Sequence, residues 1–126
     1  MTEELKLETI AKGNYSGLEG PRNSWVIDTQ QAWSAFYNKL ESKNILRPTA
    51  PSVDFNQYTV LAVYMGEKSS GGFSTEISKV LQNGKDLEVQ VQEFSHSNSM
   101  SMALTQPYHI VKVPKAEGKV EFKYLG

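Results

Sequence analysis

The residues with the most chemical potential in this chain are two histidines and a serine-rich stretch. His96 stands between Ser95 and Ser97, an arrangement that invites comparison with a nucleophile and its base. A hydrolytic triad also needs an orienting carboxylate in hydrogen-bond geometry, and the chain has no nucleophile-elbow pentapeptide. His109 lies in an apolar stretch that is predicted to be a strand, where a hydrogen-bonded or partly exposed histidine is expected rather than a ligand. A hydrolase that uses His96 is therefore the remote alternative.

Metal, phosphate and thiol chemistry lack a motif in this sequence. No HExxH cluster occurs, and Ser70-Gly71-Gly72 lacks the lysine and the following helix of a phosphate-binding loop. Asp86, Glu88 and Glu93 are better explained as the solvated face of a hairpin than as an acid and base pair. The absence of cysteine excludes disulfides, thiolate ligands and a cysteine nucleophile. We expect no cofactor, no metal site and no catalytic residues.

Length and charge narrow the class of partner. A chain of 126 residues predicts a single domain over residues 1–126, large enough to fold around its own core. The formal net charge of -1 gives no basic excess for nucleic acid or acidic lipid. No apolar run approaches the ~20 residues that span a bilayer, so we expect no membrane insertion by this segment. The first residues lack the signal-peptide pattern, although a removed signal or anchor would leave no trace.

One amphipathic helix is predicted from about residue 29 to residue 43. Its large apolar residues recur at i, i+3, i+4 and i+7 and therefore share one face; they are Trp33, Phe36, Tyr37 and Leu40. Asp28 and Gln31 have the spacing of a capping box, which places the start near Asp28 or Thr29. Prolines 48 and 51 cannot continue the helix, so a connector follows. We expect the apolar face to pack on a sheet.

The remainder of the chain favours antiparallel β structure. Asn83-Gly84 predicts a type I′ turn between two alternating segments, because a β-hairpin of this kind needs positive φ angles. Alternation predicts further strands around Leu5 to Leu7 and in residues 24–27, 58–65, 102–106, 108–113 and 120–124. The predicted fold class is α+β, mostly antiparallel, as a curled sheet or small sandwich-like barrel dominated by adjacent hairpins. An exposed edge strand could pair two copies, so the oligomeric state stays open.

The most informative loop is Gly66-Glu67-Lys68-Ser69-Ser70-Gly71-Gly72-Phe73, between two predicted strands. Gly71 and Gly72 can simply permit positive φ in a tight corner. Alternatively, the serine hydroxyls and the Phe73 ring present a contact surface on a rigid scaffold. We expect the partner-binding residues in this loop, joined by the serine-rich loop around His96. They are Ser69, Ser70, Gly71, Gly72, Phe73, His96 and Ser97.

Three blocks in order resemble the C-terminal domain of the PrcB protease-complex subunit family. The blocks are Val53-Asp54-Phe55 with residues 58–63, then residues 66–77, then Pro107 to Lys115. The family pattern has Pro-Thr and Tyr where this chain has Ser69-Ser70 and Phe73, so the tyrosine hydroxyl is missing here. The resemblance covers residues 53–115, and the segment with Trp33 is similar to the one that often precedes the domain.

This resemblance implies a bacterial, non-enzymatic accessory protein. It implies an exported, extracytoplasmic location in the cell envelope and a protein partner that is a protease or belongs to a protease complex. It carries over no catalytic residue. A looser similarity is to chagasin-type cysteine-protease inhibitors, which insert a loop of similar form into a protease cleft. The similarity makes a protease inhibitor that uses Ser69 to Phe73 the alternative function. It rests on this one loop, because the chain lacks the Arg-Pro-Trp loop of those inhibitors.

Overall fold

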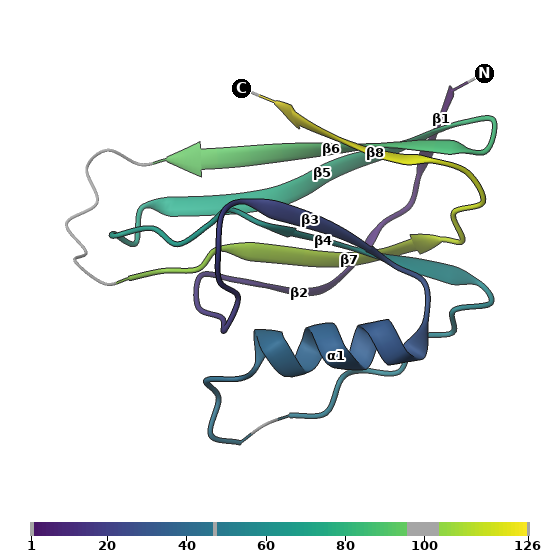
Figure 1. Cartoon of the computed structure of the whole chain (residues 1–126). Coiled ribbons are helices and arrows are strands. Elements are labelled where there is room, and N and C mark those ends of the chain that lie inside the picture. The colour runs from purple at the N-terminus through teal and green to yellow at the C-terminus, as the bar shows by residue number, and fades with distance from the viewer. Residues whose placement is uncertain (1, 47, 96–103, 126) are drawn as a thin grey trace.

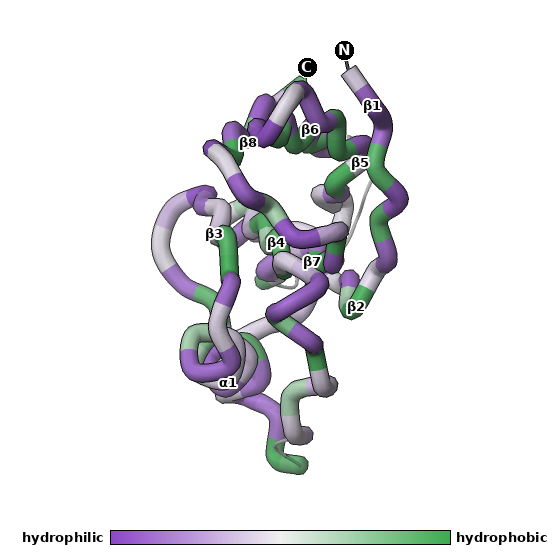
Figure 2. Tube along the Cα trace, turned by 90° about the vertical axis from the view of Figure 1, so that its right-hand side faces the viewer, coloured by the Kyte–Doolittle hydropathy of each residue, from purple (hydrophilic) through white to green (hydrophobic). Residues whose placement is uncertain are grey.

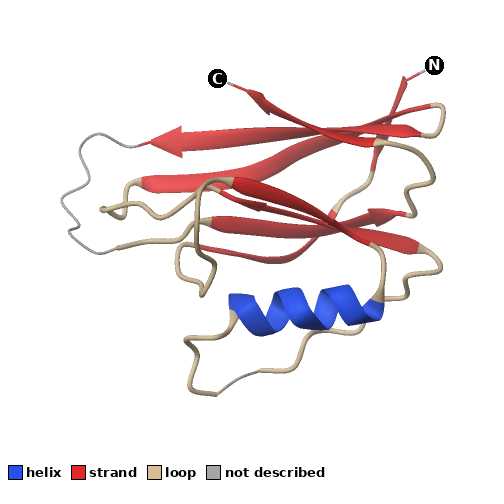
Figure 3. Cartoon of the chain, in the orientation of Figure 1, coloured by secondary structure: helices blue, strands red, loops and turns tan. Residues whose placement is uncertain are grey.

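The protein forms three layers, two β-sheets and one helix (Figures 1 and 3). The structure is a computed structural model that describes residues 2–46, 48–95 and 104–125. The outer sheet has the order β1 (Thr2–Leu5), β5 (Phe73–Asn83), β6 (Asp86–Ser95), β8 (Val120–Leu125). The central sheet has the order β2 (Glu8–Gly13), β7 (Tyr108–Pro114), β4 (Tyr58–Tyr64), β3 (Asn23–Ile27). The helix α1 (Gln30–Leu40) covers the free face of the central sheet.

Strand β4 shows why the apolar runs in the sequence are continuous. Its side chains alternate between two hydrophobic clusters, and both faces of the strand are therefore covered. Val60, Ala62 and Tyr64 face α1. Leu61 and Val63 face the outer sheet, where they meet Val80 and Val89 from β5 and β6. The central sheet thus has a core on each side.

The apolar face of α1 is confirmed. Trp33, Phe36, Tyr37 and Leu40 are all buried in the cluster between helix and sheet. Phe36 meets Trp25 of β3 edge to face, with 4.9 Å between ring centroids. The Trp33 indole N–H donates to the Pro51 carbonyl at 2.8 Å, which fixes the connector that follows the helix.

The start of the helix agrees with the prediction, whereas its end and the capping role of Asp28 do not. Thr29 is the N-cap, and its hydroxyl accepts from the Ala32 N–H at 3.1 Å. Asp28 instead accepts hydrogen bonds from the Thr59 hydroxyl and from Lys115. The helix ends at Leu40 rather than near residue 43, because the Gly17 N–H donates to the Leu40 carbonyl at 2.8 Å. The β2–β3 loop thus provides a hydrogen-bond donor for a carbonyl at the C-terminal end of the helix.

The predicted hairpin is present, but its turn is one residue further along. Asn83 pairs with Asp86, so Gly84 and Lys85 form the two-residue loop. Gly84 has φ +65°, whereas Asn83 is still part of β5. The type I′ turn centred on Asn83-Gly84 is therefore wrong, because the ladder continues through Asn83.

The α+β class and the mainly antiparallel pairing are confirmed, with two open sheets rather than a closed barrel. The dominance of adjacent hairpins is wrong, because β4 pairs with the distant β7 and β8 lies parallel to β6. The predicted strand over residues 102–106 is also wrong where it is described: Thr105 forms one isolated bridge with Lys68. Within the described residues no helix has the length and apolar character to cross a membrane.

Replacing the buried helix rings tests the packing of α1. We expect Trp33→Ala and Phe36→Ala each to lower the free energy of unfolding by roughly 3–5 kcal/mol, because each leaves a cavity. Thermal and urea denaturation measure the loss. Asn38→Ala, on the exposed side of the same helix, is the control and should change stability by less than about 0.5 kcal/mol. A Trp33→Ala melting temperature within a degree of the parent contradicts the burial of this face.

The turn is tested at Gly84, where positive φ is required. Gly84→Val should lower the free energy of unfolding by roughly 1–2 kcal/mol, because a β-branched residue disfavours left-handed backbone. Gly84→Asn is the matched control, since asparagine tolerates this conformation, and it should lose less. Equal stability of the two variants in urea denaturation contradicts the turn geometry.

Candidate protein-binding site

The candidate site lies at the end of the sandwich where β4 leaves the central sheet and β5 enters the outer sheet (Figure 1). The intervening loop is tied to the segment before β7. Lys68 and Thr105 exchange two backbone hydrogen bonds of 2.8 Å, and the Thr105 hydroxyl donates to the Ser70 carbonyl at 2.8 Å. The Met65 N–H donates to the Pro107 carbonyl at 3.0 Å. These bonds give the loop a defined position.

The predicted loop residues differ in how far they reach the surface. Ser69 is exposed, Ser70 and Gly71 are half-buried, and Gly72 is buried. Phe73 is half-buried at the start of β5, and the Lys68 ammonium lies 5.2 Å from the centre of its ring. The accessible part of this loop is therefore a short polar surface around Ser69 rather than a projecting aromatic tip.

The glycine with special backbone geometry is Gly66, not Gly71 or Gly72. Gly66 has φ +91°, and neither of the paired glycines has a positive φ. A Cβ at Gly66 would also lie 3.3 Å from the Arg22 backbone nitrogen. The explanation of the double glycine by positive φ is therefore wrong, and the tight corner is at the first residue of the loop. The loss of strand periodicity at Gly66 was the available signal in the sequence.

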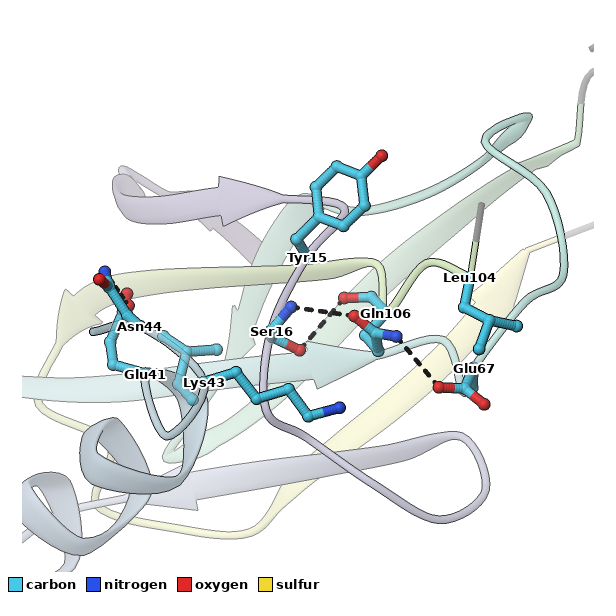
Figure 4. Close-up of a pocket in the computed structure, with 9 residues that line it drawn as sticks. Tyr15, Ser16, Glu41, Lys43, Asn44, Glu67, Leu104 and Gln106 are labelled. Atoms are coloured by element: carbon cyan, nitrogen blue, oxygen red, sulfur yellow. Dashed lines mark hydrogen bonds between the residues drawn. The ribbon is translucent and has the colours of Figure 1, made fainter. Parts of the chain in front are cut away.

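A pocket of about 490 Å³ opens beside this loop (Figure 4). It is lined by Tyr15, Ser16, Leu40, Glu41, Lys43, Asn44, Glu67, Leu104 and Gln106. Apart from Glu67 of the predicted loop, the sequence assigned these residues no role in a site, because they come from the β2–β3 loop, the end of α1 and the segments that follow the helix and precede β7. Only the fold brings them together.

Gln106 organises the base of this pocket. Its side-chain carbonyl accepts from the Ser16 N–H at 3.2 Å, and its amide donates to Glu67 at 3.0 Å (Figure 4). The Ser16 hydroxyl donates to the Gln106 backbone carbonyl at 3.3 Å. These bonds link the β2–β3 loop, through a buried amide, to the loop of residues 66–72 between β4 and β5, which we call the recognition loop because recognition was predicted there.

The rim of the pocket combines exposed apolar and charged groups. Tyr15 is 67% exposed and Leu104 is 58% exposed, which is high for large apolar side chains. Glu41, Lys43 and Glu67 add charges of both signs. Large exposed apolar side chains next to charges of both signs are a feature of many surfaces that contact other molecules.

A second hollow of about 500 Å³ is lined by Glu67 and Lys68 of the same loop, and Glu67 also lines the first pocket. Its wall includes Arg22, whose guanidinium pairs with Glu93 at 3.1 Å and lies 4.3 Å from the centre of the Tyr124 ring. The second carboxylate oxygen of Glu93 is buried and has no hydrogen-bond partner among the described residues. Glu93 is thus part of an ion pair at this end, not of a solvated hairpin face.

His109 is buried between the sheets next to the site. Its Nδ1 accepts from the Ile77 N–H of β5 at 2.8 Å, and its Nε2 lies 2.9 Å from the Thr9 hydroxyl of β2. Because the backbone N–H can only donate, the neutral ring carries its proton on Nε2 and donates to Thr9. Burial, followed by the Lys12 charge, lowers the pKa of His109 to about 4. The expectation of a hydrogen-bonded structural histidine is confirmed.

The second predicted loop lies largely outside the described residues. His96 and Ser97 are among the residues that the structure does not describe, so their role in binding stays a prediction. Ser95, the last residue of β6, pairs with Phe73, so this loop begins beside the first one. Among the residues that are described, no cluster of histidine, aspartate and glutamate can hold a metal ion.

Comparison with protein families gives one match, which covers part of the chain. Residues 59–114 match the family model described as PrcB C-terminal. The match covers somewhat less than half of the 126 residues, and it is over this segment that the chain is similar to the PrcB C-terminal family. No curated protein and no solved structure matches the chain. The predicted family is thereby confirmed, with somewhat narrower bounds than 53–115.

The PrcB C-terminal match includes the loop after β4 and the segment before β7 that holds it. It runs from β4 through the recognition loop and the β5–β6 hairpin to the end of β7. It therefore includes both the Lys68–Thr105 bridge and the His109 contact between the sheets. Strand β3 and the helix α1 precede the matched segment. The strand forms one edge of the central sheet, and the helix covers its face.

The buried imidazole predicts a pH dependence of stability. The pKa of His109 is about 4 in the folded protein and about 6.5 in the unfolded chain, so between these values the unfolded chain binds more protons. The neutral His109 ring makes its full contribution to the free energy of unfolding above pH 6.5. That contribution is lost as the pH falls toward 4, by about 3 kcal/mol in all. Urea denaturation at a series of pH values measures it.

His109→Gln is the informative variant, because glutamine can accept from the Ile77 N–H and does not titrate. It should reduce the loss of stability between pH 6.5 and 4, whereas His96→Gln should retain that loss. If His96→Gln reduces the dependence and His109→Gln does not, the assignment to the buried ring is wrong.

Proposed function

We infer that this protein is a non-enzymatic binding domain that attaches to a protease or to a protease complex outside the cytoplasm. The observation that carries the proposal is the position of the recognition loop. It lies within the PrcB C-terminal match and is fixed by hydrogen bonds to the segment before β7. A loop that is held in place loses little conformational entropy when a partner binds.

The surroundings of the loop suit a protein partner. Ser69 offers an exposed hydroxyl, and Glu67 and Lys68 offer charges at its base. The adjacent pocket offers Tyr15 and Leu104 as apolar contacts. Together they form one continuous end of the sandwich, with polar groups around apolar ones.

The same geometry supports the two alternative functions, a hydrolase and a protease inhibitor, less well. His109 is buried and uses both ring nitrogens, so it cannot serve as a base for a bound molecule. The inhibitor function needs an aromatic tip that enters a protease cleft, and Phe73 instead lies half-buried beneath Lys68. We therefore propose attachment rather than inhibition.

The proposal is tested with Ser69→Arg combined with Ser70→Arg. The double variant should stay folded by circular dichroism and should capture at least about tenfold less protease from an extract of the native host, since two large cations would occupy the contact surface. Captured protease is identified by mass spectrometry and by casein hydrolysis on the beads.

Glu117→Arg is the matched control. It also adds two positive charges, and it lies exposed in the β7–β8 connection, near the opposite end of the sandwich from the loop. It should capture as much protease as the parent. A folded double Ser→Arg variant that captures as much as Glu117→Arg would sink the binding-loop proposal. Inhibition of papain by the parent, lost in the double variant, would replace attachment with the inhibitor function.

A further inference from the structure

Strand β3 is an edge strand without the charged residues that the other three edges carry. The Ser24 N–H on its free side is held by the Asn23 side chain, which an added strand would displace. The described sheets have four edge strands: β1, β2, β3 and β8. The strand β1 is short and carries two glutamates, β2 has a bulge and a lysine, and β8 carries a glutamate and a lysine. The sequence of β3, Asn-Ser-Trp-Val-Ile, is uncharged, and its pairing with β4 is regular throughout. Such an edge is a template for another strand.

The backbone of β3 offers hydrogen-bonding groups on its free side. The Ser24 N–H donates to the Asn23 side chain at 2.8 Å and not across the ladder to β4. Because residues in a strand alternate, Ser24 and Val26 direct their backbone groups away from β4. An antiparallel strand beside β3 would bond to these two residues.

The side chains along β3 favour an apolar occupant. Val26 is 41% exposed, which is unusual for a large aliphatic residue in a strand, and it follows the half-buried Trp25. Figure 2 shows α1 directly below β3, and the contact between Trp25 and Phe36 joins the two elements. An added strand would lie beside β3 and above the outer flank of the helix.

Opposite charges stand at the two ends of β3. Arg22 precedes the strand and Asp28 follows it, and their side chains are 51% and 41% exposed. Each has one ion-pair partner, Glu93 and Lys115 respectively, and each remains open to solvent. Both residues share the parity of Ser24 and Val26, so their side chains lie on the same face. An antiparallel segment fits best with an acidic residue opposite Arg22 and a basic residue opposite Asp28.

We propose that β3 binds an extended segment of a protein partner as a fifth, antiparallel strand of the central sheet. The segment carries a basic residue first, uncharged residues with apolar side chains in the middle, and an acidic residue six positions later. A second copy of the chain fits less well, because a two-fold axis beside β3 would bring the two α1 helices together below the shared edge (Figure 2). Arg22 also lines the hollow formed with Gly66 and Lys68, so a bound segment would end next to the recognition loop.

A synthetic peptide tests this without knowledge of the natural partner. The heptapeptide Arg-Asn-Ser-Trp-Val-Ile-Asp has the sequence of residues 22–28 and complements that segment in antiparallel register. Its arginine faces Asp28, and its aspartate faces Arg22. A fluorescein-labelled form is titrated with the full chain, and binding is followed by fluorescence polarisation.

Two methylated peptides separate strand addition from simple apolar contact. N-methylation of the peptide's valine removes an amide that bonds to Ser24 and should weaken binding at least about tenfold. N-methylation of the adjacent tryptophan affects an amide that points away and should change binding by about twofold or less. Equal effects of the two methyl groups, or no binding of the parent peptide, overturn the proposal.

The protein side is tested at Val26. Val26→Pro removes an N–H that does not bond to β4, so the edge strand should tolerate it, and the peptide should bind at least about tenfold more weakly. Val26→Thr keeps the N–H and the branched shape and should bind as the parent does. Equal binding to both variants overturns strand addition. A concentration-dependent dimer that Val26→Pro abolishes also overturns it, because the edge then accepts a second copy.

This inference stands apart from the recognition loop. The Ser69→Arg, Ser70→Arg variant leaves β3 unchanged and should bind the peptide as the parent does. Loss of protease capture with intact peptide binding affects the loop alone.

Discussion

The link from His109 to Ile77 is the contact on which the arrangement of the two sheets depends. The core between the sheets consists mostly of aliphatic side chains, whose packing is favourable in many registers. A hydrogen bond from a backbone N–H of β5 to an imidazole of β7 has only one register. The bulge in β5 follows Ile77 directly, and a bulge in β2 lies next to Thr9, which holds the other ring nitrogen. Two irregular strands and one buried ring therefore define how the layers align.

This alignment reaches the candidate site within a few residues. His109 is the second residue of β7, and the segment just before it pairs with Lys68 and supports the recognition loop. Val63, three residues before the corner at Gly66, lies opposite His109 in the ladder. The loop is thus attached close to the hydrogen bond that joins the two sheets. A surface of this kind can recognise a partner through side chains that are already in place.

Local patterns in the sequence were sufficient to predict the helix and most strands, but not how these elements pair and pack. The periodicity of α1 identified all four core side chains, because burial of an amphipathic helix follows directly from residue spacing. The helix end was misplaced because Gly17, distant in the sequence, occupies the Leu40 carbonyl. The parallel pairing of β8 with β6 also had no local signal, since alternation is the same for either direction.

For the candidate site, too, the sequence predicted individual residues but not which of them lie together. The loop around Ser69 was found from its composition, but the pocket beside it joins residues 15 and 16 to 104 and 106, and no spacing rule connects them. His109 was recognised as structural, whereas its partners Thr9 and Ile77 follow from strand order alone. Gly66 was overlooked because Gly71 and Gly72 form the more conspicuous pattern, although the left-handed corner is at Gly66.

The central claim is that a neutral His109 ring joins the sheets through both nitrogens. Long-range ¹H–¹⁵N correlation of the histidine rings reports the tautomer and the titration of each one. The account predicts that one ring keeps its proton on Nε2 at pH 7 and begins to titrate only as the pH approaches 4, with the Ile77 amide signal shifting over the same range. A His109 ring with its proton on Nδ1, or one that titrates near pH 6.5, would contradict it.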